Sequence, residues 1–201
     1  MRVTIDNTEI QTSDSIAQAL DAARDHAEKS GRLIVDINAD GEPIDDAMLD
    51  NPPEDTGGIK HLELTTTDPV AFLVETFTSA RESLALVRED QGTAADQIRT
   101  GALEPAIESL NAIMTGWQAV GDVVSQSAEL ADIDLATFTF SGSSAGECIS
   151  KLSETLFEIR TNLTHQDWSA LGDSIEYDLD EQAQQWDALL DALTQRVQQG
   201  G

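Results

Sequence analysis

Apolar residues recur at alternating three- and four-residue spacing in four stretches between residue 68 and the end of the chain. Such spacing gives each helix one apolar stripe, which must face other helices. The stripe positions are Val70, Leu73, Phe77, Ala80, Leu84 and Val87, then Leu103, Ile107, Leu110, Met114, Trp117 and Val124, then Ile149, Leu152, Leu156, Ile159 and Leu163, and finally Ile175, Leu179, Trp186, Leu189 and Leu193. The sequence therefore predicts an all-α four-helix bundle over residues 68–201, whose first helix begins at Asp68-Pro69 and breaks at Gly101.

Residues 1–67 show shorter patterns, which indicate strands and one helix. Asp6-Asn7 tolerates the positive φ of a tight hairpin turn, and Ser13–Ser15 offers caps for a helix that ends near Lys29. The predicted strands are Arg2–Ile5, Thr8–Gln11, Leu33–Ile37 and Ile59–Leu64, with irregular loop between the last two. This order of elements resembles the β-grasp, or ubiquitin-like, fold, in which one helix packs on a mixed sheet. The expected fold class is thus α+β, with a small β-grasp-like recognition unit over residues 1–67 followed by the helical domain.

The segment from Asp167 to Leu179, which reads DWSALGDSIEYDL, is the most distinctive in the chain. It is similar to a segment of uncharacterised bacterial proteins that join a small β-grasp-like unit to a helical tail. That resemblance implies the same two-part architecture and carries no activity. Because Tyr177 lies off the apolar stripe, we predict an interaction patch made of Trp168, Asp173, Glu176, Tyr177 and Asp180. The alternative is that this segment only starts the fourth helix.

The chain of 201 residues has 38 acidic and 11 basic residues and a net charge of −27. Such a surface repels nucleic-acid phosphates and anionic membranes, whereas a partner with a basic surface is electrostatically favoured. General solubility is the alternative explanation of the charge. Cys148 is the single cysteine, which favours a reducing compartment, and neither a signal peptide nor a membrane span is evident. We expect a cytoplasmic protein. The sequence does not specify its oligomeric state, and a homodimer is one of the alternatives.

Two patterns in the sequence raise the question of a metal site. Asp36, Asn38, Asp40 and Gly41 match the start of a calcium loop, but Ala47 stands where a bidentate glutamate is needed, which favours a turn. In the fourth helix, Asp173, Glu176, Asp178, Asp180 and Glu181 resemble the magnesium carboxylates of an all-helical nucleotide pyrophosphohydrolase. Asp173, Asp180 and Asp187 follow the core positions by one residue, so a solvated acidic face is the expected structure. We therefore predict neither a metal nor a cofactor site.

Gly142-Ser143-Ser144-Ala145-Gly146 matches the G-x-S-x-G pattern of a nucleophile elbow. An elbow needs a parallel sheet beneath it and a histidine close to the serine. Only His165 follows Ser144 in the sequence, and it is expected at the far end of the third helix. Helix capping by Ser143 or Ser144 is thus the expected role, and no catalytic residue is predicted.

The sequence as a whole favours a non-enzymatic protein-protein interaction protein, such as an adaptor, a chaperone-like factor or a regulatory subunit. This prediction rests on two observations: the apolar pattern of the helices is clear, and no group of residues in the sequence is expected to come together as an active site. A divalent-metal-dependent nucleotide pyrophosphohydrolase of the helical domain is the alternative, and a hydrolase acting through Ser144 is a third.

Overall fold

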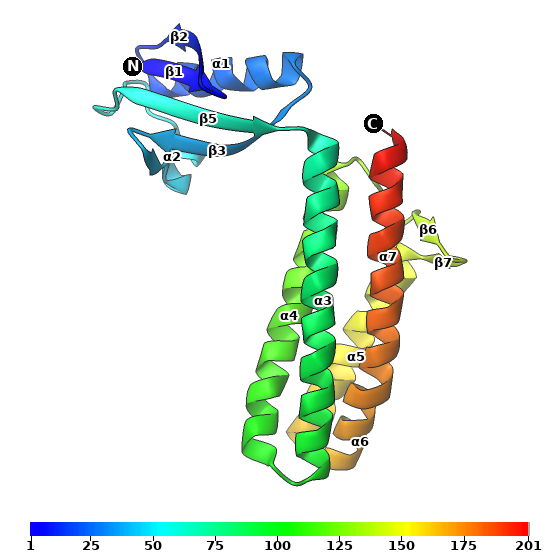
Figure 1. Ribbon diagram of the computed structural model, residues 1–201. Helices are drawn as coiled ribbons and strands as arrows, with labels where there is room; N and C mark the ends of the chain where they lie inside the picture. The colour runs from blue at the N-terminus through cyan, green and yellow to red at the C-terminus, as the bar shows by residue number, and fades with distance from the viewer. Residues whose placement is uncertain (201) are drawn as a thin grey trace. The chain divides into compact units, whose positions relative to one another are not determined.

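The computed structural model describes residues 1–200, apart from the side chains of Gln11 and Thr12. The protein is α+β, with a small sheet in its N-terminal part and a helical C-terminal part (Figure 1). Two compact units divide at Phe72, within the first turns of α3. The sequence placed the boundary after residue 67, which is the end of strand β5.

The N-terminal unit is a five-stranded mixed sheet in the order β2-β1-β5-β3-β4. Strand β1 pairs antiparallel with β2 and parallel with β5, while β3 pairs antiparallel with β5 and β4. The elements are β1 (Arg2–Ile5), β2 (Thr8–Thr12), α1 (Ile16–Lys29), β3 (Leu33–Ala39), β4 (Glu42–Pro43), α2 (Asp46–Asp50) and β5 (His61–Thr67). Asp6 and Asn7 take the positive φ values of 48° and 65° that the hairpin prediction requires.

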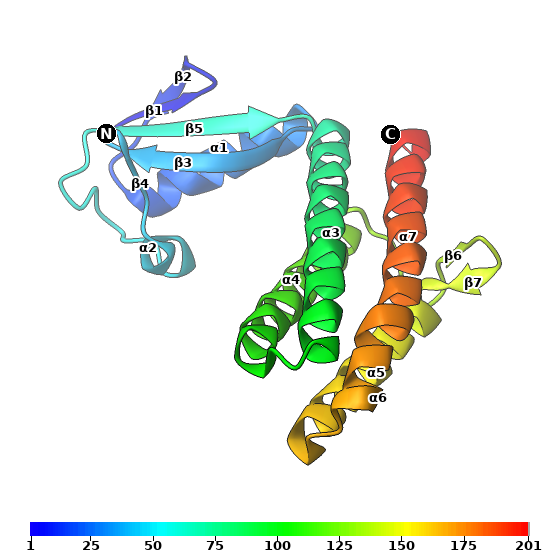
Figure 2. The same cartoon turned by 60° about the horizontal axis from the view of Figure 1, so that its bottom comes forward.

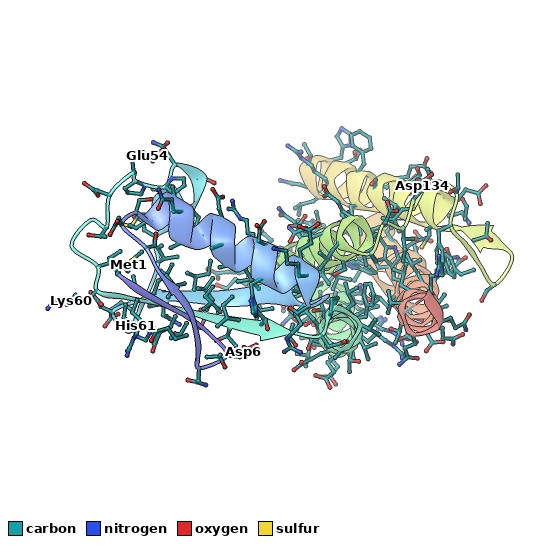
Figure 3. The ribbon with its side chains drawn as sticks, turned by 90° about the horizontal axis from the view of Figure 1, so that it is seen from above. Met1, Asp6, Glu54, Lys60, His61 and Asp134 are labelled. Atoms are coloured by element: carbon teal, nitrogen blue, oxygen red, sulfur yellow. The ribbon has the colours of Figure 1, made fainter. Side chains whose placement is uncertain are left out.

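Strand alternation places the core of this unit between the sheet and α1. Val3 and Ile5 of β1 and Leu62 and Leu64 of β5 are buried together with the apolar side of α1. Figure 3 shows Met1, Lys60 and His61 at one end of the sheet and Asp6 at the other. The last strand begins two residues later than predicted, at His61, and α2 lies in a stretch for which no helix was predicted.

The C-terminal unit consists of four long helices with short elements between them. They are α3 (Pro69–Arg99), α4 (Leu103–Leu130), β6 (Thr139–Phe140), β7 (Ser143–Ser144), α5 (Ala145–His165), α6 (Trp168–Asp173), the π-helical turn η1 (Ser174–Asp178) and α7 (Leu179–Gly200). One apolar core draws on all four long helices and includes Phe77, Trp117, Ile159 and Trp186. Figures 1 and 2 show α3 beside both α4 and α7. No helix within residues 1–200 is long and apolar enough to cross a membrane.

The apolar stripe predicted for α4 is wrong at two positions. Ile107 and Met114 are exposed, whereas Ala106 and Ile113 are buried with Leu110. Apolar residues occupy both neighbouring faces of this helix, and the buried face is the one turned toward α3. Gly116 allows that approach, because a Cβ there would lie 2.3 Å from Cγ2 of Val87 on α3.

The predicted fourth helix is interrupted by a turn that its pattern did not specify. The first helical turn begins near Asp167-Trp168, as predicted, and the Asp167 carboxylate caps α6 by accepting a hydrogen bond from the Ala170 amide, but η1 separates α6 from α7. Leu171, Ile175, Leu179 and Ala183 are all fully buried at a spacing of four residues. An α-helix has 3.6 residues per turn, so a strict spacing of four drifts around it. The wider π turn offsets this drift and keeps the four side chains in the core.

Candidate functional site

Three arginines of α3 bind carboxylates of η1 and α7. Nε and Nη2 of Arg81 donate to the two carboxylate oxygens of Asp187 at 2.7 and 3.1 Å, and Arg81 also pairs with Asp191 at 3.4 Å. Arg88 pairs with Asp180 at 2.6 Å, and Arg99 pairs with Glu176. These pairs form a ladder along one side of the α3–α7 contact. We call them the arginine ladder.

The ladder shifts the pKa values of three of its members. The hydrogen bond from Arg88 lowers the pKa of Asp180 below its usual value, outweighing the opposing effect of burial. Hydrogen bonds to Asp187 and Glu176 raise the pKa values of Arg81 and Arg99 above their usual values. Asp180 and Glu176, which the sequence offered as magnesium ligands, are therefore each bonded to a guanidinium. Within residues 1–200, no three His, Cys, Asp or Glu residues come together in a way that could hold a metal ion.

A pocket of about 220 Å³ lies where the end of α3 meets α6 and η1. Its lining includes Ile98, Arg99, Trp168, Gly172, Asp173 and Glu176. A Cβ on Gly172 would lie 3.5 Å from Cγ2 of Ile98, an ordinary van der Waals distance, so α6 and the end of α3 pack closely here. The pocket thus combines an indole, a guanidinium and carboxylates beside the π turn.

The structure brings together three of the five residues predicted for the interaction patch. Trp168 is half-buried, Asp173 is exposed and Glu176 is half-buried, and all three line this pocket. Tyr177 lies on the same π turn and is 63% exposed. Asp180 does not line the pocket and instead binds Arg88. In the described part of the chain, the Asp173 side chain makes no hydrogen bond or ion pair, and its carboxylate is exposed.

Sequence reasoning missed the role of the arginines. Arg81 and Arg88 are seven residues apart, as are Asp180 and Asp187, and such matched spacing on two helices is a signal of facing pairs. Arg99 departs from that spacing, so its partner Glu176 could not be inferred in this way.

Two glutamine side chains are buried in the apolar core of the helical unit. Gln91 on α3 is 3% exposed, and neither its amide nitrogen nor its amide oxygen has a partner in the described structure. Gln182, which interrupts the predicted stripe of α7, is 6% exposed and has an unpartnered oxygen. A buried amide without partners is destabilising relative to an apolar side chain of similar size.

The serine of the elbow-like motif has a structural role. The Ser144 hydroxyl accepts a hydrogen bond from the Glu147 amide, and the Glu147 carboxylate accepts one from the Ser144 amide. This reciprocal capping box starts α5, as the capping prediction requires. The two-stranded ribbon β6–β7 that precedes the helix is antiparallel, and His165 is the last residue of α5. The geometry of a nucleophile elbow is therefore not formed around Ser144.

The calcium-like motif is a turn between β3 and β4, as expected. Asp40 and Gly41 have φ values of 53° and 92°. The Asp40 carboxylate accepts hydrogen bonds from the amides of Lys60 and His61 at the start of β5. Asp40 therefore joins two strands of the sheet.

The helical unit also identifies the family of the chain. The family model of a domain of unknown function, DUF8042, matches residues 75–189. The chain belongs to the DUF8042 family. The matched region contains the π turn, the pocket beside it and every member of the arginine ladder except Asp191, and it excludes the N-terminal sheet. No curated protein and no solved structure matches the chain.

Proposed function

We propose that this protein is a cytosolic, non-enzymatic interaction protein in which a β-grasp-like head precedes a four-helix bundle. We place the docking site for a basic segment of a partner protein at the π turn. The observation that supports this most is the combination of an exposed Tyr177 with a pocket lined by Trp168 and the unpaired carboxylate of Asp173.

The chemistry of this surface suits a lysine or arginine side chain. Aromatic faces attract cations, and an exposed aromatic ring combined with a carboxylate is a common anchor at protein interfaces. Arg99 already binds Glu176 from within the chain, so a guanidinium can reach this carboxylate. A partner cation would add a second contact at Asp173. The large negative charge of the chain would also speed encounter with a basic partner.

Site-specific photo-cross-linking tests the proposal. A photo-reactive amino acid replaces Tyr177 in the full chain, and the matched control carries it at Glu75, which is exposed on the same helical unit near the other end of α3. We expect a partner with a basic segment to cross-link at position 177 alone. Asp173→Asn should reduce the yield, and Glu75→Gln, which removes the same charge, should not.

Two results would count against this function. Equal cross-linking at positions 177 and 75 would show that the π turn is not a preferred docking surface. Turnover of a nucleoside triphosphate with magnesium, abolished by Glu176→Gln, would instead favour the pyrophosphohydrolase alternative. The bond from Arg99 to Glu176 argues against that outcome, because the carboxylate already has a cationic partner.

A further inference from the structure

Helix α4 has more apolar surface than the core of its unit uses. Ile107 is 41% exposed and Met114 is 36% exposed, although the sequence pattern placed both in the apolar stripe of this helix. They are seven residues apart and therefore lie on one side of the helix, two turns from each other. On the neighbouring α5, Ile149 and Leu156 are only partly buried and Phe157 is 70% exposed. Apolar side chains on both helices are thus left without full cover.

A groove of about 500 Å³ runs between these two helices. Met114, Gly121 and Ser125 line it from α4, and Ile149, Ser153 and Leu156 line it from α5. Small side chains at Gly121, Ser125 and Ser153 leave the groove hollow. Its length along α4, from Asn111 to Ser125, corresponds to about 21 Å at the helical rise, or four turns.

Two tryptophans contribute to the lining of the groove. Trp117 of α4 and Trp186 of α7 pack edge to face, with ring centroids 5.7 Å apart and an interplanar angle of 77°. Both side chains are at least 98% buried, and neither indole N–H has a hydrogen-bond partner in the described structure. A buried indole N–H normally has a partner, so this part of the unit has unused hydrogen-bonding capacity.

The charges on the walls favour a basic occupant. Helix α4 carries four acidic residues, Glu104, Glu108, Asp122 and Glu129, and no basic residue. Asp122 lines the groove itself. Helix α5 carries two basic residues, Lys151 and Arg160, and three glutamates. A second copy of this chain would bring another net charge of −27 to this surface and would be repelled at low ionic strength.

We propose that the groove between α4 and α5 binds an amphipathic helix of about 14 residues from a basic partner, with its apolar side in the groove and cationic residues toward α4. The helix acts as a fifth element of the unit and covers Met114, Leu156 and the floor beside Trp117. The inference rests on the proposed function as an interaction protein, but it concerns a surface other than the π turn.

A peptide titration tests the inference with a defined probe. The probe is a 14-residue peptide of leucine and lysine whose leucines recur at three- and four-residue spacing, and its control is a peptide of the same composition with a scrambled order. The full chain carries Trp168→Phe, so that fluorescence and indole N–H resonances report on Trp117 and Trp186 only. We expect the striped peptide to bind about tenfold or more tightly than the scrambled one and to shift both indole resonances.

Variants separate the groove from general charge attraction. Met114→Glu adds a negative charge, which should strengthen non-specific binding of lysine, yet it should weaken the striped peptide about tenfold by spoiling the apolar contact. Gly121→Leu fills the groove and should also weaken binding of the striped peptide. Leu86→Glu makes the matched change at a residue that is 63% exposed on α3 and should have no effect on the difference between the peptides.

Each remaining result overturns the inference. Equal affinity for the two peptides would mean that charge alone drives binding, and an unchanged affinity in Met114→Glu would place the contact elsewhere. Self-association that Met114→Glu abolishes would make a second copy the occupant. Asp173→Asn tests the π turn separately, since it should leave the striped peptide's advantage over the scrambled peptide intact. Loss of photo-cross-linking at position 177 would therefore not affect this result.

Discussion

Replacing Gly116 on α4 by alanine should destabilise the helical unit. Replacing glycine by alanine inside a helix usually stabilises it by about 0.5–1 kcal/mol. At Gly116, however, the new Cβ would lie 2.3 Å from Cγ2 of Val87, far inside van der Waals contact. Val87 is buried and β-branched, and valine in a helix has one strongly preferred χ1 rotamer. The clash must therefore be relieved by moving α3 away from α4.

Overpacking of this kind costs about 1–3 kcal/mol. Gly92 on α3 provides a matched control, because a Cβ there would meet no atom within 4 Å. Gly92→Ala and Gly116→Ala share the gain in helix propensity, so the difference between them isolates the clash. We expect Gly92→Ala to be more stable than Gly116→Ala by about 1–3 kcal/mol. In a chain of this size, that corresponds to roughly 2–4 °C in melting temperature per kcal/mol.

Urea unfolding followed by tryptophan fluorescence measures the difference. All three tryptophans lie in the helical unit, so the signal reports on that unit. The double variant Gly116→Ala/Val87→Ala removes the clashing methyl and should recover the part of the loss caused by the clash, although it opens space in the core. Two results would refute this reasoning: equal stability of Gly116→Ala and Gly92→Ala, or additive effects of the substitutions at 116 and 87 on the free energy of unfolding. Either would mean that the close approach of α3 and α4 does not disfavour alanine at position 116.

Three further predictions follow from groups described above. Gln91→Leu should stabilise the helical unit by about 1–3 kcal/mol in urea unfolding, because it removes a buried amide without partners. Gln198→Leu, at an exposed position, should change stability by less than about 0.5 kcal/mol. Ser144→Ala should lower stability by about 0.5–2 kcal/mol through loss of the capping box, and a fluorophosphonate probe should not label the wild type at Ser144. Burial raises the pKa of the Cys148 thiol to about 11, so a disulfide reagent at pH 8 should label it only after denaturation.

The outcomes that contradict these predictions are specific. A loss of stability in Gln91→Leu would mean that the amide has partners in solution. Wild-type stability in Ser144→Ala would mean that other contacts start α5. Rapid labelling of Cys148 in the native chain would show that α5 opens readily near its first turns.

Local signals in the sequence predicted much of the fold. Asp6-Asn7 specified the first hairpin, Asp68-Pro69 marked the start of α3, and Ser143-Ser144 marked the start of α5. Each of these signals acts within a few residues, through backbone geometry or a capping hydrogen bond. For that reason they can be read from one sequence.

The details that depend on neighbouring helices were not predictable in this way. Helix α4 has apolar residues on two adjacent faces, and whether Ile107 or Ala106 is buried depends on how closely Gly116 lets α3 approach. Predicting the π turn would have required knowing that Leu171, Ile175 and Leu179 are all buried. Their burial at four-residue spacing is the reason why the helix widens there. The sequence singled out Glu176 and Asp180, but their arginine partners are 77 and 92 residues away in the chain.

The arginine ladder also bears on how α3 and α7 choose their alignment. Asp173, Asp180 and Asp187 are seven residues apart, as are Arg81 and Arg88. If α7 slid by one heptad, Arg81 and Arg88 would face Asp180 and Asp173, so the pairs with Asp187 and Asp180 alone do not distinguish the two registers. The pair between Arg99 and Glu176 lies outside the heptad and is formed only in the observed alignment. The slip would also place Gln184 where Asp191 now pairs with Arg81. The pairs Arg99–Glu176 and Arg81–Asp191 therefore favour the observed register over the slipped one.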